Sequence, residues 1–255
     1  LSAYLGAAAP SAAAVAVYAS GGYLYPQDDL RQLEDEIRAL LGQGYTHVKI
    51  KIGSVPLAQD LRRVEAASAL LPYPEHLAVD AMNAYDAQAS LVAAKALAPH
   101  RLWWLEDVCD PLDFETLAAL ARGYDGPLAA GEALFSAAEA VLLARHGGLR
   151  CERDILQFDP VHCYGIPGYL RIVERLAASG WPRRAFWPHG GHLFCLHLVS
   201  SLGLGGAEVN PFAFQPFGGL SQKTLPLSGR AAPPEVPGIG FEEKPELYRL
   251  MQALA

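Results

Sequence analysis

The stretch Val48-Lys49-Ile50-Lys51-Ile52-Gly53 (VKIKIG) has the composition of a buried strand, except that it contains two lysines. Because side chains at i and i+2 of a strand share a face, Lys49 and Lys51 should lie side by side. Their like charges are expected to lower the pKa of at least one of them, which suits a general base. The alternative is an ordinary strand whose polar face meets water. The residues at the ends of the other strands help to decide between these interpretations.

Short apolar runs alternate with amphipathic stretches along almost the whole chain, which is the pattern of βα units repeated around a parallel sheet. The first interval is typical, since Leu33, Ile37 and Leu40 recur at helical spacing before Gly42 and Gly44. Helices are expected there and at 56–71, 87–98, 111–122, 136–146, 166–179 and 192–203. The expected strands are 14–19, 47–53, 77–82, 103–107, 128–133, 155–160, 185–190 and 206–210.

Eight strands with seven intervening helices predict an α/β fold, a modified TIM barrel of the (β/α)7β type whose last helix is missing or displaced. Residues 1–210 would form the catalytic barrel domain. The tail 211–255 is rich in Pro and Gly and is expected to be a loop-rich segment that packs on the barrel. The rival architecture is a doubly wound open sheet, but no G-x-G-x-x-G follows an early strand to support a dinucleotide site.

Composition narrows the class of protein. The 255 residues are 51% hydrophobic and 18% charged, enough for one large domain, and the net charge of -7 with scattered basic residues argues against a nucleic-acid partner. The four cysteines include no Cys-x-x-Cys pair, which favours a reducing cytoplasmic location. The Ala-rich start is uncharged and interrupted by Pro10, so it predicts neither a signal peptide nor a membrane span. A small-molecule partner is therefore expected.

Carboxylates end three successive strands. Asp80, Glu106 and Glu132 are spaced by 26 residues each, one βα unit apart. Because the carboxyl ends of parallel barrel strands meet at one face, the three charges should be neighbours, an arrangement that needs a cation. Oxygen ligands favour Mg²⁺, with Mn²⁺ as the second choice. The alternative is that each carboxylate is a helix cap or a surface residue.

His189 follows the expected strand 185–190 in the motif WPHGGHLF. Asp159 ends the preceding strand, so its carboxylate can orient the imidazole and raise its basicity, as acid/base histidines require. A structural histidine is the alternative. Glu208 ends the last strand, and His192 is expected to be structural rather than a second functional imidazole.

These residues resemble the mandelate racemase subgroup of the enolase superfamily, whose sites use a Lys or His base with Mg²⁺. The resemblance extends across 160 residues and is carried, in chain order, by Lys49, Lys51, Asp80, Glu106, Glu132, Asp159, His189 and Glu208.

The resemblance implies a carboxylate substrate whose α-proton is removed to give an enediolate near a metal held by the three carboxylates. Lys51 would be the base on one face of the substrate, and Lys49 would tune its pKa. His189, paired with Asp159, would be the acid or base on the opposite face. Glu208, in its protonated form, would donate a hydrogen bond to the enediolate oxygen. Relatives of this kind imply a symmetric homo-oligomer and no membrane partner.

Loop motifs resemble the branch of acid-sugar dehydratases that includes tartrate dehydratase: EDVCDPLDF, GEALFS, YGIPGYL, PHGGH and FQPFGGL. This implies loss of a β-hydroxyl after α-proton removal, giving a 2-keto acid from a sugar acid or a hydroxy-dicarboxylate. One alternative is a racemase or epimerase of an α-hydroxy acid that uses the same site. Another is a metal-binding barrel without turnover.

The sequence departs from the family pattern at three places. Asn83 stands one position later than the family's Asp-x-Asn, and Ala133 replaces the amide of Gly-Glu-Asn. The resemblance also implies an N-terminal α+β capping domain over the barrel mouth, and this domain is expected to be absent from this chain.

Overall fold

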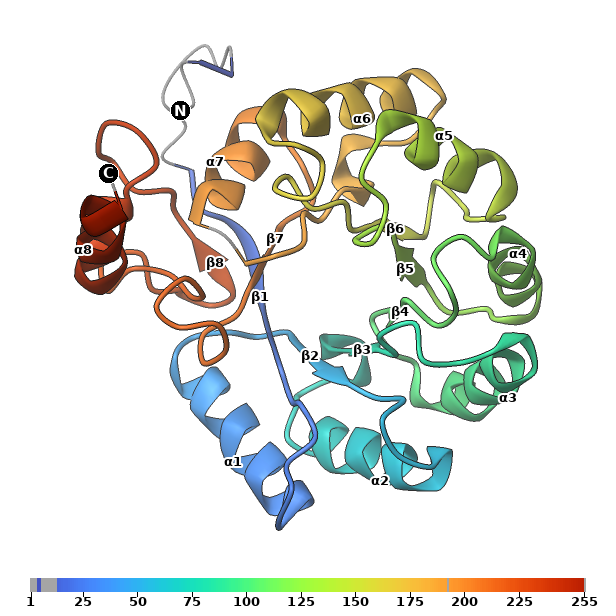
Figure 1. Cartoon of the computed structure of the whole chain (residues 1–255). Coiled ribbons are helices and arrows are strands. Elements are labelled where there is room, and N and C mark those ends of the chain that lie inside the picture. The colour runs from blue at the N-terminus through green and yellow to red at the C-terminus, as the bar shows by residue number, and fades with distance from the viewer. Residues whose placement is uncertain (1–3, 6–12, 192, 255) are drawn as a thin grey trace.

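The computed structural model describes residues 4–5, 13–191 and 193–254. The sheet curls around a central axis with helices outside it (Figure 1). Its strands follow the order β6-β5-β4-β3-β2-β1-β7, all parallel, and β8 pairs with β1 in the antiparallel sense. The strands are β1 (Val15–Gly21), β2 (Val48–Lys51), β3 (Leu77–Asp80), β4 (Leu105–Glu106), β5 (Leu128–Ala130), β6 (Ile155–Leu156), β7 (Ala207–Val209) and β8 (Arg230–Ala231). The predicted α/β barrel fold is confirmed.

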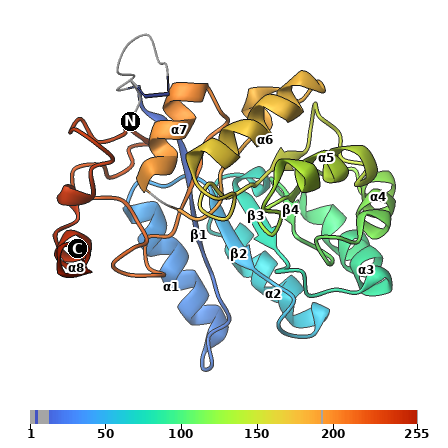
Figure 2. The ribbon, with the colours of Figure 1, turned by 45° about the horizontal axis from the view of Figure 1, so that its top comes forward.

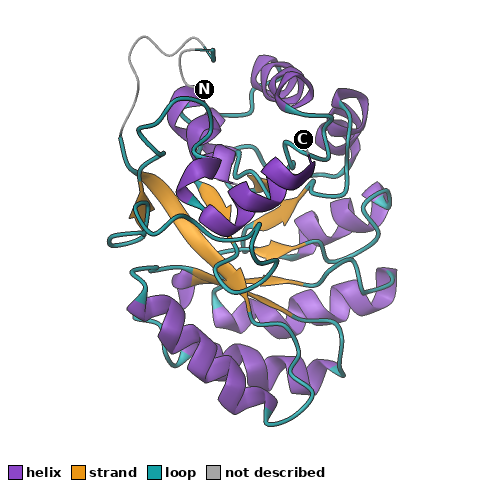
Figure 3. Ribbon diagram, turned by 60° about the vertical axis from the view of Figure 1, so that its left-hand side comes forward, coloured by secondary structure: helices purple, strands orange, loops and turns teal. Residues whose placement is uncertain are grey.

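The helices cover the outer face of the sheet (Figures 1 and 3). Several begin at a polar cap, since Asp86, Asp113 and Ser136 accept hydrogen bonds from the backbone of the first turn of α3, α4 and α5. None of the described helices is long and apolar enough to cross a membrane. The helices are α1 (Asp29–Gly42), α2 (Leu57–Ser68), α3 (Ala87–Leu97), α4 (Phe114–Gly123), α5 (Ala137–His146), α6 (Ile166–Ala178), α7 (Leu193–Leu202) and α8 (Pro245–Leu254).

The prediction of a strand at 185–190 is wrong, because these residues do not form a regular strand. Residues 183–185 form a 3₁₀ turn, and the next residues make one bridge, between Phe186 and Leu156 of β6. The nitrogen of Trp187 then donates to the oxygen of Leu156 at 2.9 Å, and the oxygen of Pro188 accepts from Glu208 of β7 at 3.5 Å. Pro188 offers no N–H to a ladder, which limits the pairing. The segment 186–188 nevertheless joins the two edges of the curled sheet.

The interior of the barrel is filled below its C-terminal face by an aromatic cluster. Tyr18, Ala78, Trp104 and Ala129 pack together there, and the ring centroids of Tyr18 and Trp104 lie 5.1 Å apart in an edge-to-face arrangement. The inward layer above this cluster consists of charged side chains. This packing provides a rigid base for that layer.

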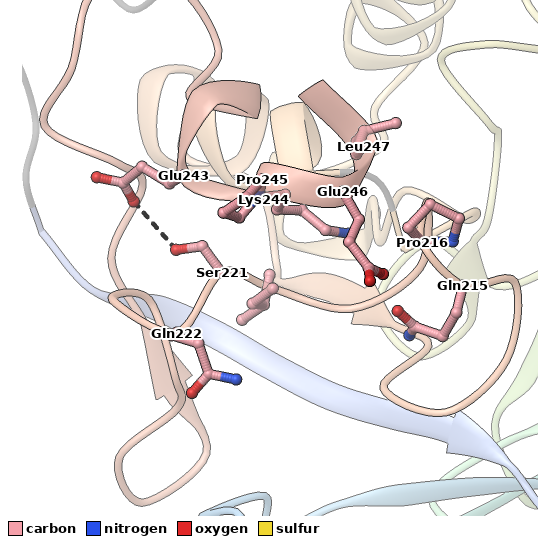
Figure 4. Close-up of a pocket in the computed structure, with 10 residues that line it drawn as sticks. Gln215, Pro216, Ser221, Gln222, Glu243, Lys244, Pro245, Glu246 and Leu247 are labelled. Carbon is pink, nitrogen blue, oxygen red and sulfur yellow. Dashed lines mark hydrogen bonds between the residues drawn. The ribbon is translucent and has the colours of Figure 1, made fainter. Parts of the chain in front are cut away.

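The tail beyond residue 210 contains more regular structure than the expected loop. It forms β8 and α8, the latter after the long red and orange segment in Figures 1 and 2. A pocket of about 200 Å³ lies between residues 215–222 and 243–247 (Figure 4). Beside it, Ser221 Oγ donates to Glu243 at 3.0 Å, and the Lys244 ammonium donates to the carbonyl oxygens of Phe217 at 2.8 Å and Gly218 at 2.6 Å. These contacts tie α8 to the loop that precedes it.

Candidate active site

A cavity of about 410 Å³ opens at the C-terminal ends of the strands. Its size suits a small organic ligand. Five of the residues that line it were predicted from the sequence to be functional: Lys51, Glu132, Asp159, His189 and Glu208. Lys49 and Asp80 contact Glu208 and Lys51 of this set, and Glu106 contacts Lys49. The structure therefore brings together the eight residues that the sequence singled out.

The two lysines face inward and contact carboxylates. Lys49 is fully buried, with its ammonium against Glu106 and 3.2 Å from Glu208. Lys51 Nζ lies 2.5 Å from Oδ2 of Asp80, its register partner on β3. A strand whose polar face meets water is thereby excluded.

The expected lowering of the lysine pKa values is wrong. Burial lowers the pKa of Lys49, but Glu106 and Glu208 outweigh it and raise that pKa well above its usual value. Burial and Lys49 both lower the pKa of Lys51, yet Asp80 and Glu208 shift the balance and raise it. The repulsion between the two lysines is outweighed by the carboxylates around them, which come from other strands.

Asp80, Glu106 and Glu132 each offer a carboxylate oxygen, and these three atoms lie within 4.8 Å of one another. Glu132 Oε2 is buried without a hydrogen bond, although His189 Nε2 lies 3.2 Å away. Three converging hard oxygen donors, one of them lacking a hydrogen bond, fit a divalent cation of the Mg²⁺ class.

Glu106 is held in place from beneath. Its Oε2 accepts hydrogen bonds from Trp104 Nε1 at 2.7 Å and from Gln157 Nε2 at 2.8 Å. Gln157 in turn accepts from the Tyr18 hydroxyl at 3.3 Å. Burial raises the pKa of Glu106 to about 7, against the opposing charge of Lys49. These orienting roles were not predicted from the sequence, although Trp104 and Gln157 lie within the expected strands 103–107 and 155–160, two residues before Glu106 and Asp159.

His189 has the partner that the sequence predicted. Its Nδ1 lies 2.9 Å from Oδ2 of Asp159, and its Nε2 lies 3.7 Å from Oε2 of Glu208. Burial lowers the pKa of this imidazole, but Glu208, Asp159 and Glu132 outweigh it and raise the pKa to about 9. The imidazole is therefore held as the cation at neutral pH, which suits a general acid.

The expectation that Glu208 is protonated is wrong in this structure. Burial raises its pKa, but the charges of Lys49, His189 and Lys51 outweigh this and lower the pKa far below its usual value. Its Oε2 also accepts a hydrogen bond from the backbone nitrogen of Gly190 at 3.0 Å. Glu208 is therefore a carboxylate that holds the segment carrying His189.

The displaced asparagine does not line the main cavity. Asn83 lies with Asp107 at a separate small pocket, and the neighbouring Met82 faces the main cavity instead. Both Met82 and Asn83 have positive φ, so the one-residue shift is accommodated by a left-handed turn. His192 lies outside the described residues.

Several cavity residues were missed by the sequence analysis. His162 lies three residues after Asp159, and its ring centroid is 5.9 Å from that of His189. The motifs YGIPGYL and FQPFGGL indicated only a family resemblance. Phe214 and Phe217, which belong to FQPFGGL, line the cavity. The i, i+3 spacing of Asp159 and His162 was a usable signal for this site.

A sequence model described as "Enolase C-terminal domain-like" matches residues 32–247. The chain belongs to this family. It is 24% identical over 230 residues to an arabinonate dehydratase of Saccharolobus solfataricus, covering 89% of this chain and 61% of that protein. It is 30% identical over 182 residues to an L-talarate/galactarate dehydratase of Salmonella typhimurium, covering 71% of this chain and 44% of that protein.

Among solved structures, an L-talarate dehydratase from Polaromonas sp. JS666, complexed with Mg and L-glucarate, superposes with a TM-score of 0.76 at 28% identity. The match covers 94% of this chain and 63% of that one. This enolase C-terminal-like chain thus spans about three fifths or less of the length of these relatives.

Proposed function

We propose that this chain is the barrel of a Mg²⁺-dependent dehydratase that acts on a sugar acid or a tartrate-like hydroxy-dicarboxylate. The observation that carries the proposal is the pairing, across one cavity, of a lysine beside three carboxylates with a histidine held as the cation. The dehydratases among the relatives support the same reaction class.

The carboxylates of Asp80, Glu106 and Glu132 would hold Mg²⁺. The bound ion would supply positive charge toward the substrate carboxylate, where charge develops when the α-proton leaves. Lys51 contacts Asp80, which helps to raise the pKa of its ammonium; a cation held by Asp80 would weaken this contact and so favour the neutral amine. All eight residues assigned to the site serve this one arrangement.

Lys51, once neutral, takes the α-proton, and the electron pair of that C–H bond forms the enediolate. The β-carbon to oxygen bond then breaks, and His189 donates its proton so that the hydroxyl leaves as water. The resulting enol tautomerises to a 2-keto acid. Lys49 balances the buried charges of Glu106 and Glu208, and Asp159 fixes the His189 ring. Glu208 supports the backbone of Gly190.

A racemase or epimerase is the second candidate, because Lys51 and His189 are two acid/base groups that reach the same cavity. In that reaction one group removes the α-proton, and the other returns a proton to the opposite face. No leaving hydroxyl is needed, so the two reactions share the first step and differ only after it.

A substrate screen tests the proposal. Sugar acids and hydroxy-diacids are incubated with Mg²⁺ and with this chain or the full product of its gene, and 2-keto acid formation is scored. We expect keto acid from at least one compound and none from the Lys51→Met or His189→Asn variants. Exchange of the α-proton in deuterated water without keto acid would favour the racemase. Absence of both reactions from the full product would refute catalysis and leave a metal-binding barrel.

A further inference from the structure

A second set of metal-ligating side chains lies beside the carboxylate group, and its donors are softer. Asp159, His162 and His189 each offer one ligand atom, and these atoms lie within 4.8 Å of one another. Two imidazoles with one carboxylate favour Zn²⁺, Co²⁺ or Ni²⁺ over Mg²⁺. We propose that this set binds a transition-metal ion, Zn²⁺ or a chemical equivalent, in addition to the Mg²⁺-type site.

The first argument is the orientation of the His162 ring. Its Nδ1 lies 3.1 Å from the main-chain oxygen of Glu132. Because a carbonyl oxygen only accepts, Nδ1 carries the proton and Nε2 is left with its lone pair. Metal-binding histidines are oriented in this way by a backbone carbonyl or a carboxylate.

The second argument is that the ring of His189 also directs one nitrogen at Asp159. Its Nε2 lies 3.2 Å from the Glu132 side chain, which leaves Nδ1 directed at Asp159. Glu132 thus lies beside one nitrogen of each imidazole, with its main-chain oxygen near His162 and its carboxylate, which has no hydrogen bond, near His189. The two remaining nitrogens both face Asp159.

The third argument is distance. His162 Nε2 lies 3.9 Å and His189 Nδ1 lies 2.9 Å from Oδ2 of Asp159. Ligand atoms of a tetrahedral zinc site with bonds of about 2.0 Å are about 3.3 Å apart. The side chain of His162 is 43% exposed and can rotate by the small amount required.

The site has a consequence that rests on the proposed function. An ion held by His189 Nδ1 would displace the proton that this nitrogen shares with Asp159, which would be released to solvent, and would remove the imidazole from proton transfer. Zn²⁺ would therefore inhibit turnover while Mg²⁺ remains bound at Asp80, Glu106 and Glu132. Excess Mg²⁺ should not relieve this inhibition.

The test measures binding first, on tag-free chain with saturating Mg²⁺. Co²⁺ is titrated by calorimetry, and its visible absorption reports nitrogen ligation and low coordination number. His162→Asn keeps a donor for the Glu132 oxygen but removes the ligating nitrogen. We expect it to weaken Co²⁺ and Zn²⁺ binding by at least about 10-fold, since even loss of a supporting hydrogen bond weakens metal sites by that factor. Its Mg²⁺ affinity should stay the same.

The matched control is His146→Asn, which removes an exposed imidazole at the end of α5 and should bind Co²⁺ like the parent. Unchanged Co²⁺ affinity in His162→Asn would overturn the proposal, as would one-for-one displacement of Co²⁺ by Mg²⁺. If a substrate is found, the rate of each protein with Zn²⁺ is divided by its own rate without Zn²⁺. His162→Asn should lose a smaller fraction of its activity to Zn²⁺ than the parent. If the substrate screen gives no product, the Co²⁺ binding result still stands. The dehydratase proposal and the metal-site proposal are therefore tested independently.

Discussion

The ammonium of Lys49 lies fully buried against the carboxylate of Glu106, with no exposed area on either side chain. Replacing Lys49 by Met leaves Glu106 and Glu208 buried without this countercharge. We expect the free energy of unfolding to fall by about 3 kcal/mol, as when one partner of a buried pair is removed. Mg²⁺ should restore part of the loss. Urea unfolding with and without Mg²⁺ measures both effects, and Lys95→Met on the exposed face of α3 is the control. A variant as stable as the parent would contradict the assigned role.

Trp104 orients Glu106 through its indole nitrogen. Trp104→Phe keeps an aromatic ring in the barrel interior but removes this donor. The expected result is a 10- to 100-fold lower Mg²⁺ affinity, about the effect of losing a hydrogen bond that orients a metal ligand. Calorimetry measures the affinity, and Trp103→Phe, which alters the ring packed on His47, is the control. Equal affinities in the two variants would show that the indole donor is unimportant.

Asp159 acts on the proposed reaction through His189. Asp159→Asn should lower kcat by about 10²- to 10⁴-fold, the usual contribution of a positioned acid or base. Because the two residues form one unit, the double variant with His189→Asn should be no slower than His189→Asn alone. Additive losses in steady-state kinetics would show that Asp159 has a separate role.

His47, which lies away from the cavity, should make the free energy of unfolding depend on pH. Burial, with His76 beside it, lowers the pKa of His47 to about 4. The unfolded chain binds this proton from about pH 6.5, so the stabilisation is present above that pH and is lost as the pH falls toward 4. Between pH 7 and 5 the parent should lose about 1 kcal/mol more than His47→Gln, allowing for partial exposure of the ring. Urea unfolding at both values tests this, and equal losses would refute it.

Lys244 anchors the cavity loop through carbonyls of residues 217 and 218 and, at 3.2 Å, of Gly219. Lys244→Met should leave these carbonyls without their donor and speed amide exchange at 217–220 by about 10-fold, since hydrogen bonds to a charged group are worth about 1.5 kcal/mol or more. Hydrogen-exchange mass spectrometry measures the rates. Lys223→Met, which removes an exposed ammonium 3.6 Å from Glu243, should leave them unchanged.

The barrel and its inward residues were predictable because strand alternation and the spacing of one βα unit fix which side chains meet. Asp80 and Glu106 are register partners on neighbouring strands, so their encounter follows from the fold itself. The helix α8 could also have been predicted, since Leu247, Leu250 and Leu254 have helical spacing that the Pro-rich surroundings obscured.

Charge states were not predictable in the same way. The pKa of Lys51 depends on the balance between Lys49, Asp80 and Glu208, which come from three different strands. The spacing of residues indicates which groups are neighbours but not which contacts dominate. The position of His162 likewise depends on its bond to the backbone of Glu132, a contact across 30 residues that no local pattern encodes.

Residues 186–188, which join the two edges of the curled sheet, are its least regularly paired part. Along the ladder from β2 to β4, successive strands carry paired register residues, whereas this join depends on one bridge and a few backbone hydrogen bonds. Local opening of a protein begins where such bonds are fewest. His189 directly follows this join, whereas Asp80 and Glu106 lie on the paired strands β3 and β4. We therefore expect local opening to begin around His189 and to leave the paired positions of Asp80 and Glu106 in place.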